Sequence, residues 1–250
     1  SKRVCKHHKL MFEKVVGSWP REQRFILTSC DDQYFTQYFP RFYKTFSECW
    51  DLPIHVHVID PSVLTMKRLE SLKVSYTHCI TDPLVLKHRY SYVTYCQAQR
   101  FILLGYNLLD NQSVVVADVD SYALRKPSEE QKHTLESDMA FTEYNKRLMA
   151  TFCNFHHSRK YHAKKAAVRM KDMIINTDKI GVDQLVIKEI FSKFHYNNLT
   201  HRQWIRHLDN RTNADHVQHN KCLIYHEKGT RGKEKGIKVA WQDVIETDIE

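Results

Sequence analysis

Short apolar runs and longer amphipathic stretches alternate along the first half of the chain. Their periods predict strand, helix, strand, helix, helix and strand, in turn at 24–29, 33–48, 54–60, 62–73, 90–104 and 113–117. Pro40 is expected to interrupt the first helix, and Gly105 and Asn107 to end the third. This order is typical of an open, mostly parallel sheet covered by helices, so the sequence predicts the α/β class.

Two further patterns refine this prediction. In the strand at 54–60, aliphatic residues alternate with His55 and His57, which predicts one apolar face and one wetter face. A late helix is expected at 183–194, because apolar side chains recur there every four residues, at Val182, Val186, Ile190 and Phe194. After residue 120 the alternation is otherwise irregular, and no biased tract marks a linker or repeat. We therefore expect a single domain over 1–250.

The apolar run at 113–117 ends in two carboxylates, Asp118 and Asp120. A continuous β-branched run suits a strand that is buried on both faces, and ligands of open α/β sheets collect at the carboxyl ends of such strands. Unpartnered acids are costly to bury there, so a cation is expected, and carboxylate oxygens suit Mg²⁺ or Mn²⁺. The alternative is a strand end whose acids accept hydrogen bonds from loop amides.

The charge balance adds a second expectation. The chain carries 38 Lys and Arg against 29 Asp and Glu, a net charge of +9. Basic residues concentrate at 2–9, 159–171 and 228–238, the second of these in a segment with helical character. Such surfaces attract nucleic acid, anionic lipid headgroups or phosphorylated substrates. A solvated basic face without a dedicated ligand is the alternative.

The cysteines and the termini indicate a compartment. Seven scattered cysteines without a Cys-x-x-Cys pair favour reduced thiols over a disulfide framework or a zinc site. The first nine residues are basic and lack the apolar core of a secretory signal. No stretch reaches the roughly 18 apolar residues of a membrane span. A cytoplasmic protein is expected, which its basic surface could bring into peripheral contact with a membrane.

Five segments carry motif-like residues, and in chain order they are Thr28-Ser29-Cys30-Asp31-Asp32-Gln33-Tyr34, Arg100, Asp118-Val119-Asp120, Asp183-Gln184 and Tyr225-His226-Glu227-Lys228-Gly229. Together they resemble the motifs of the retaining glycosyltransferases of family eight, the glycogenin and lipopolysaccharide-galactosyltransferase type, of which the chain would be a remote relative. The resemblance extends over about 200 of the 250 residues. It implies a GT-A-like fold, with a Rossmann-like nucleotide-sugar half at about 20–126 and an irregular acceptor-side half at 127–250.

The resemblance also implies how a UDP-sugar donor would be held. Asp31 would contact the base, Gln33 stands where the family has Asn, and Tyr34 would stack on uracil. Arg100 and Lys233 would place positive charge on the diphosphate, since guanidinium and ammonium groups both bind phosphate oxygens. Val119, between the two acids, is placed among the donor-binding residues.

At the reacting end, the resemblance implies that Asp118, Asp120 and His226 hold Mn²⁺ or Mg²⁺. Asp183 and Gln184 would lie at the transferred sugar, where the neutral amide of Gln184 could stabilise a developing oxocarbenium ion. Transfer would then proceed with retention, to an acceptor that the sequence does not name, a glycan or an anionic lipid-linked molecule.

The chain departs from the family pattern in three places. Lys233 stands one residue later than the family's diphosphate-binding lysine, without the following Pro-Trp, so Arg231 is an alternative. Leu185 replaces the last acid of the Asp-Gln-Asp motif. The segment Cys153-Asn154-Phe155 is the only candidate for a sugar-binding loop that usually contains glycine.

Two other classes of protein remain as alternatives. A nucleotidyltransferase also uses paired acids and a divalent ion, but a glycine-rich phosphate loop is expected early in that fold, and 30–34 contains no glycine. A non-catalytic module that binds nucleic acid or another polyanion accounts for the positive charge, but leaves Asp118 and Asp120 unexplained. Nucleic acid is therefore not the expected partner.

Overall fold

The computed structural model describes residues 15–72, 74–136, 139–144, 147–200, 205–208, 223–227 and 238–245. Its centre is an eight-stranded sheet of order β1-β4-β3-β2-β5-β8-β7-β9. These strands are β1 Val16–Gly17, β2 Arg24–Asp31, β3 Ile54–Ile59, β4 Ser75–Cys79, β5 Ser113–Ala117, β7 Met139–Tyr144, β8 Arg147–His156 and β9 Asn197–Thr200. A smaller sheet of order β10-β11-β6 is formed by β10 Ile205–Leu208, β11 Ile224–Glu227 and β6 Ser121–Ala123.

The large sheet is mostly parallel in its first half and mixed in its second. Strands β4, β3, β2 and β5 run parallel, whereas β8 joins β5, and β7 joins β8, in antiparallel orientation. In the described part of the chain, six α-helices accompany the sheets, namely α2 Asp32–Cys49, α3 Val63–Ser71, α4 Ser91–Asn107, α5 Glu129–Leu135, α6 Lys160–Asn176 and α7 Val182–Phe191. The predicted α/β class is confirmed.

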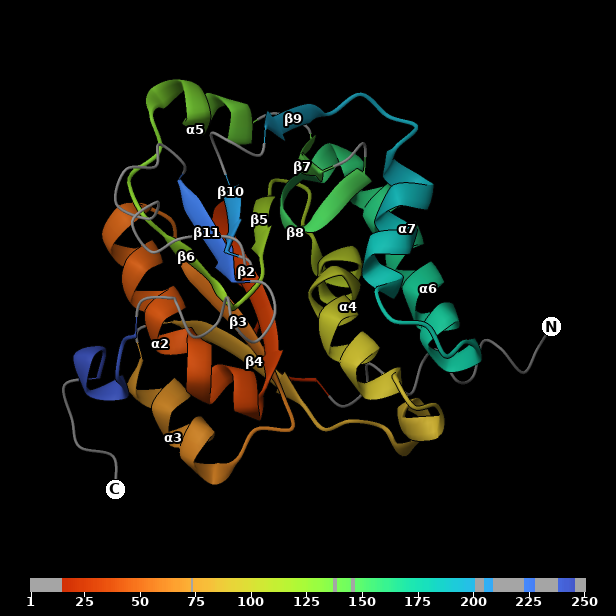
Figure 1. Ribbon diagram of the computed structural model, residues 1–250, viewed down its shortest axis with the longest axis horizontal. Helices are drawn as coiled ribbons and strands as arrows, with labels where there is room; N and C mark the ends of the chain where they lie inside the picture. The colour runs from red at the N-terminus through yellow and green to blue at the C-terminus, as the bar shows by residue number, and fades with distance from the viewer. Residues whose placement is uncertain are drawn as a thin grey trace.

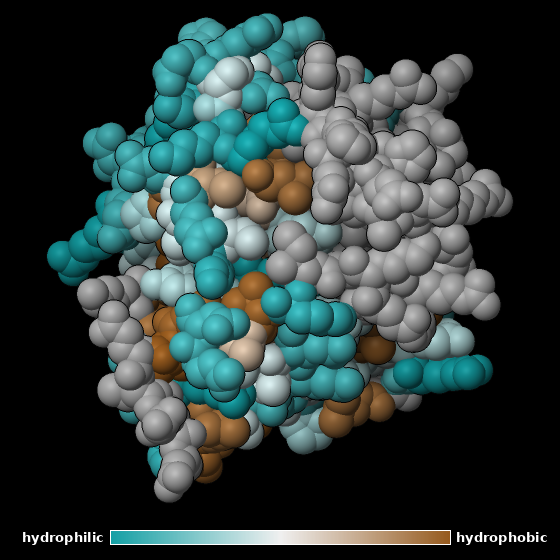
Figure 2. All heavy atoms as spheres, turned by 60° about the vertical axis from the view of Figure 1, so that its left-hand side comes forward, coloured by the Kyte–Doolittle hydropathy of each residue, from teal (hydrophilic) through white to brown (hydrophobic). Residues whose placement is uncertain are grey.

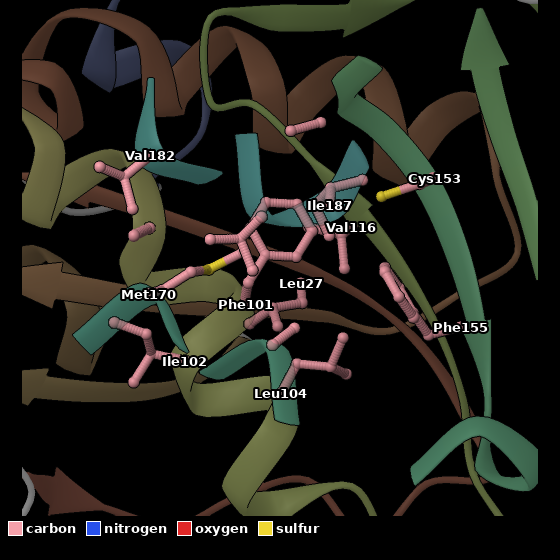
Figure 3. Close-up of a cluster of buried hydrophobic side chains, with 14 of the residues drawn as sticks. Leu27, Phe101, Ile102, Leu104, Val116, Cys153, Phe155, Met170, Val182 and Ile187 are labelled. Atoms are coloured by element: carbon pink, nitrogen blue, oxygen red, sulfur yellow. The ribbon is translucent and has the colours of Figure 1, made fainter. Parts of the chain in front are cut away.

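Helices cover both faces of the large sheet (Figure 1). On one side, α4, α6 and α7 enclose a core that includes Phe101, Met170 and Ile187 (Figure 3). On the other side, α2 and α3 cover a second core, and Figure 2 shows that mostly hydrophilic residues, with separate hydrophobic patches, form the described surface there. Because β5 lies between the two cores, Val114 and Val116 face the first and Val115 the second, as the continuous apolar run predicted.

Helix α2 continues through Pro40, where an interruption was expected. Its aromatic side chains recur at helical spacing and are fully buried, at Phe35, Phe39, Phe42 and Phe46. This packing outweighs the local cost of proline, which removes one backbone donor from the helix. Helix α3 ends at Ser71 and α7 at Phe191, each earlier than predicted.

His55 and His57 do not form a wetter face, because both side chains are fully buried. Their rings bond to the neighbouring strand β4: Thr77 Oγ1 lies 3.1 Å from His55 Nε2 and 2.9 Å from His57 Nδ1. Cys79 Sγ lies 3.3 Å from His57 Nε2. Strand β4 was not predicted, so the hydrogen-bond partners that allow these histidines to be buried were not expected either.

Gly105 lies inside α4 rather than after its end. A Cβ atom at this position would stand 2.4 Å from the backbone oxygen of Ala163 and 2.6 Å from the Cβ of Ala167, both on α6. Glycine is therefore required here for the close approach of two helices rather than for a helix end.

The segment Cys153-Asn154-Phe155 is not a loop. It lies within β8 and is buried, and Asn154 Oδ1 accepts a hydrogen bond of 3.1 Å from Ser113 Oγ on β5. Its asparagine is therefore engaged within the sheet, which corrects the expectation that this segment could form part of a sugar-binding loop.

Candidate metal and nucleotide site

The turn between β5 and β6 presents two carboxylates at the carboxyl end of the buried strand. The backbone N–H of Asp118 donates to Thr151 O (3.0 Å), and the N–H of Ser121 donates to Asp118 O (3.0 Å), which closes the turn. The side chains of Asp118 and Asp120 remain 20% and 13% exposed. The sequence thus directs both acids to one small, partly open region.

His226 reaches this region through strand pairing. Strand β11 pairs with β6 in antiparallel orientation, and His226 stands opposite Ser121, the residue after Asp120. Its Nε2 lies 3.3 Å from Asp118 Oδ2 and 3.2 Å from Asp120 Oδ1. The three ligand atoms lie within 4.8 Å of one another, so these three residues could hold a metal ion.

The positive charge of a protonated His226 offsets part of the negative charge of the two acids. Burial disfavours the charged form of His226, but the carboxylates of Asp120 and Asp118 outweigh burial and raise its pKa to about 9. The protonated imidazole therefore links the two acids at neutral pH. Two carboxylate oxygens and one imidazole nitrogen are ligands that Mn²⁺ accepts, and Mg²⁺ also favours the oxygens. A divalent ion would take over the role of the imidazolium proton.

Arg100, on α4, joins the same cluster. Its Nη2 lies 2.6 Å from Asp118 Oδ1 and 3.4 Å from Asp183 Oδ2, and it donates to Ala150 O at 3.2 Å. Burial raises the pKa of Asp183 to about 6, with Arg100 acting against burial and Asp118 acting with it. The residue predicted to bind phosphate thus lies between two carboxylates.

Asp183 and Gln184 lie in the first turn of α7, which Gly181 begins with a left-handed backbone (φ 72°). Gln184 is partly buried, and its Nε2 donates to Leu148 O at 2.8 Å, so the amide fastens α7 to β8. The structure brings Asp183 to Arg100 and the acids, while Gln184 makes a backbone contact beside them.

The predicted base-binding residues lie at the end of β2 and the start of α2. Asp31 Oδ1 accepts a hydrogen bond of 2.8 Å from the backbone N–H of Tyr34 and so caps the helix. The ring of Tyr34 lies 5.1 Å from that of Tyr38, and Gln33 is exposed. One of the carboxylate oxygens of Asp31 therefore has a structural role.

Val119 has a buried side chain, 4% exposed, so it would offer a ligand its backbone only. Lys233 and its alternative Arg231 lie outside the described residues.

Asp60 follows β3 and so lies at the same carboxyl end of the parallel strands as Asp118, but it was not predicted from the sequence as a candidate site residue. It has a positive φ of 51°, which is uncommon for a residue other than glycine. Its carboxylate accepts from Thr81 N at 2.7 Å and from Thr81 Oγ1 at 2.5 Å, and the hydroxyl of Tyr92 also bonds to it. Asp60 could have been recognised from the sequence by its position directly after an apolar strand, the same pattern that identified Asp118.

The basic residues of α6 are less exposed than expected, and some of them are paired with acids. Lys171 is buried, Lys160 pairs with Asp110 at 2.8 Å and Arg169 pairs with Asp172 at 3.2 Å. Acids from neighbouring positions neutralise part of this surface, which weakens it as a polyanion site. Among the described residues, no helix has the length and apolar character needed to cross a bilayer.

Comparisons with known proteins identify the fold. No family model and no curated protein matches the chain. Solved structures do match, among them structures of glycosyltransferases, and they show the GT-A-like fold that the motifs implied.

One of these structures is the bifunctional glycosyltransferase WbbM in its apo form, with a TM-score of 0.57 and 12% identity over 86% of this chain. The chain spans 47% of the length of that protein. Another is the galactosyltransferase LgtC, solved in complex with donor and acceptor sugar analogs, with a TM-score of 0.54 and 11% identity. That match covers 82% of this chain and 87% of LgtC. At these identities the likeness concerns the fold.

Proposed function

We propose that the protein is a metal-dependent glycosyltransferase that moves a sugar from a UDP-sugar to an acceptor, with retention at the anomeric carbon. The observation that carries the proposal is the cluster of Asp118, Asp120 and His226 within 4.8 Å, at a strand end of a glycosyltransferase fold. In this proposal, 20–126 form the nucleotide-sugar half and 127–250 the acceptor-side half. The acceptor would be a glycan or a lipid-linked molecule.

The main chemical demand is the departure of a nucleoside diphosphate, whose negative charge grows as the glycosidic bond breaks. Asp118, Asp120 and His226 would hold a Mn²⁺ or Mg²⁺ ion, which supplies Lewis-acid neutralisation of that charge. Arg100 keeps Asp118 in position through the 2.6 Å contact and adds fixed positive charge in a largely buried region. The cluster is thus suited to a diphosphate rather than to a neutral ligand.

The base and the sugar would lie on either side of this cluster. Asp31 is held by its capping bond at the carboxyl end of β2, and the ring of Tyr34 is next to it on α2, an arrangement suited to hydrogen bonding and stacking with uracil. On the other side, Nε2 of Gln184 is committed to Leu148 O. Its amide oxygen therefore remains as the group that could face a developing positive charge.

The direct test is to measure the binding of UDP with and without Mn²⁺ by thermal shift and calorimetry. A ligand present at about 100 times its dissociation constant should stabilise the fold by roughly 2.7 kcal/mol. Asp120→Ala should abolish the Mn²⁺-dependent part of this stabilisation. Asp110→Ala should not, because it replaces an exposed acid that pairs with Lys160. Undiminished metal-dependent affinity in Asp120→Ala would remove the site from the proposal.

Product analysis tests the reaction itself. Release of UDP from a UDP-sugar supports a glycosyltransferase, whereas release of pyrophosphate from a nucleoside triphosphate would support the nucleotidyltransferase alternative. Proton NMR of the product anomer reports the stereochemistry, and an inverted product, or full turnover by Gln184→Ala, would exclude the retaining mechanism with Gln184.

A further inference from the structure

Arg41 is a buried cation in the middle of α2, behind the metal-site turn. The residue is only 3% exposed, and its guanidinium carries a positive charge. The guanidinium carbon lies 4.6 Å from the ring centre of Tyr122 and 5.7 Å from that of Tyr38. Its Nη2 donates to the backbone oxygen of Asp120 at 3.4 Å. A buried charge requires such compensating contacts, and one of them is with a candidate metal ligand.

A second contact, one helical turn later on α2, holds β6, the strand that follows this turn. Thr45 Oγ1 donates to Arg41 O at 2.8 Å and accepts from the backbone N–H of Ala123 at 3.1 Å. Helix α2 therefore holds this segment on both sides of Tyr122, at Asp120 just before β6 and at Ala123 at its end. Because β6 in turn pairs with β11, the position of His226 opposite Ser121 depends on the same anchor.

We propose that Arg41 is a positioning residue for the metal site, an inference that rests on the proposed function. By holding the carbonyl of Asp120, it limits the directions in which the carboxylate on the same Cα can point. By stacking on Tyr122, it fixes the strand to which β11 is paired. Tyr38, its other aromatic neighbour, packs on Tyr34, so a series of contacts connects the predicted base-stacking ring to Asp120 through Arg41.

The opposing interpretation is that Arg41 only stabilises the core. Metal affinity separates the two roles, since mutation of a residue that orients metal ligands typically weakens metal binding 10- to 100-fold. The chain offers a matched control in Arg68 on α3, whose guanidinium also stacks on an aromatic ring, that of Trp241 at 4.5 Å. Loss of a stacked arginine is common to Arg41→Met and Arg68→Met, whereas loss of a contact with Asp120 belongs to the first alone.

The experiment is calorimetric titration of the full chain with Mn²⁺ alone, without nucleotide. We expect Arg41→Met to weaken Mn²⁺ binding by at least about tenfold, Arg68→Met to leave it within about twofold, and Arg41→Lys to recover part of the loss because the charge over Tyr122 is kept. Thr45→Val, which removes the second anchor, should also weaken binding, and it replaces Arg41→Met as the deciding variant if circular dichroism shows that Arg41→Met does not fold.

The outcomes are distinguishable. If the wild-type chain binds Mn²⁺ and Arg41→Met binds it equally well, the role of Arg41 is refuted and the proposed function stands. If the wild-type chain binds no Mn²⁺, the metal-dependent function fails and the role of Arg41 fails with it. If Arg68→Met weakens Mn²⁺ binding as much as Arg41→Met does, the effect is one of general stability and the inference is overturned.

Discussion

Replacement of Arg100 by methionine should destabilise the fold by about 3–5 kcal/mol, the usual cost of removing one partner from a buried ion pair. The side chains of Arg100 and Asp183 are 5% and 7% exposed, and Arg100 also lies 2.6 Å from Asp118. At an effective dielectric of about 20, unit charges about 3 Å apart attract by roughly 5 kcal/mol before desolvation is counted. Methionine fills a similar volume but leaves both carboxylates without this cation.

The pH dependence of this loss follows from Asp183. Its pKa is about 6 in the fold and about 3.9 in an unfolded chain. The folded state therefore binds the proton more tightly, and the resulting stabilisation is complete below about pH 4 and disappears as the pH rises through about 6. In Arg100→Met the pKa of Asp183 should rise further. The destabilisation should therefore be smaller at pH 5 than at pH 7.5.

The assay is urea unfolding, followed by circular dichroism, of a four-member cycle: wild type, Arg100→Met, Asp183→Asn and the double variant. The double variant should recover about 1–3 kcal/mol relative to the sum of the single changes, since neutral Asn needs no cation. Arg24→Met is the matched control, because Arg24 pairs with Glu136 at 2.7 Å where both side chains are 32–49% exposed. That exposed pair should be worth about 1 kcal/mol or less. Equal losses in Arg24→Met and Arg100→Met would refute the reasoning.

Three other predictions follow from the structure. Mn²⁺ affinity should rise with pH up to about 9, because the pKa of His226 is raised to about 9 and metal binding requires its neutral form. Calorimetry at pH 7.5 in buffers of different ionisation enthalpy should show that a proton is released on binding, and buffer-independent heats would contradict this. Gly105→Ala should destabilise by several kcal/mol, despite the better helix propensity of alanine, because its Cβ would meet Ala163 O at 2.4 Å; unchanged urea unfolding would contradict the close approach. Burial lowers the pKa of His55 and of His57 to about 3. Each should therefore lower the free energy of unfolding by about 2 kcal/mol between pH 7.5 and pH 5, because the unfolded chain takes up protons that the fold excludes. If the free energy of unfolding of His57→Asn depends on pH as steeply as that of wild type, this reasoning is contradicted.

The strands and helices that carry strong apolar periods were predictable from the sequence. Strands β2, β3 and β5 fall within two residues of their predicted bounds, because each is an apolar run of strand length. Strand β4 was not predicted, since Ser75-Tyr76-Thr77-His78-Cys79 has no apolar period. Its burial depends on hydrogen bonds to the histidines of β3, which only tertiary pairing creates. Strands β7 and β8 lie where the sequence alternation becomes irregular.

The candidate site shows the same division between local and distant information. Asp118 and Asp120 could be identified from their position after a buried strand. His226 is 106 residues beyond Asp120, and no local pattern relates them; only the order of motifs in a resembling family suggested it. The physical cause of their meeting is the pairing of two short strands, β6 and β11. Arg41, in turn, was hidden in an aromatic helix whose pattern indicates only a core.

The charge arrangement of the site explains how acids can be held together before any ion binds. Asp118, Asp120 and Asp183 would repel one another within a partly buried region, and the chain supplies two cations of different kinds against them. Arg100 contacts both Asp118 and Asp183 through its guanidinium group. His226 contacts both Asp118 and Asp120, and in the proposed function its ring nitrogen would exchange a proton for the metal ion. A divalent ion bound as proposed would therefore replace the imidazolium proton and add one further positive charge against the carboxylates.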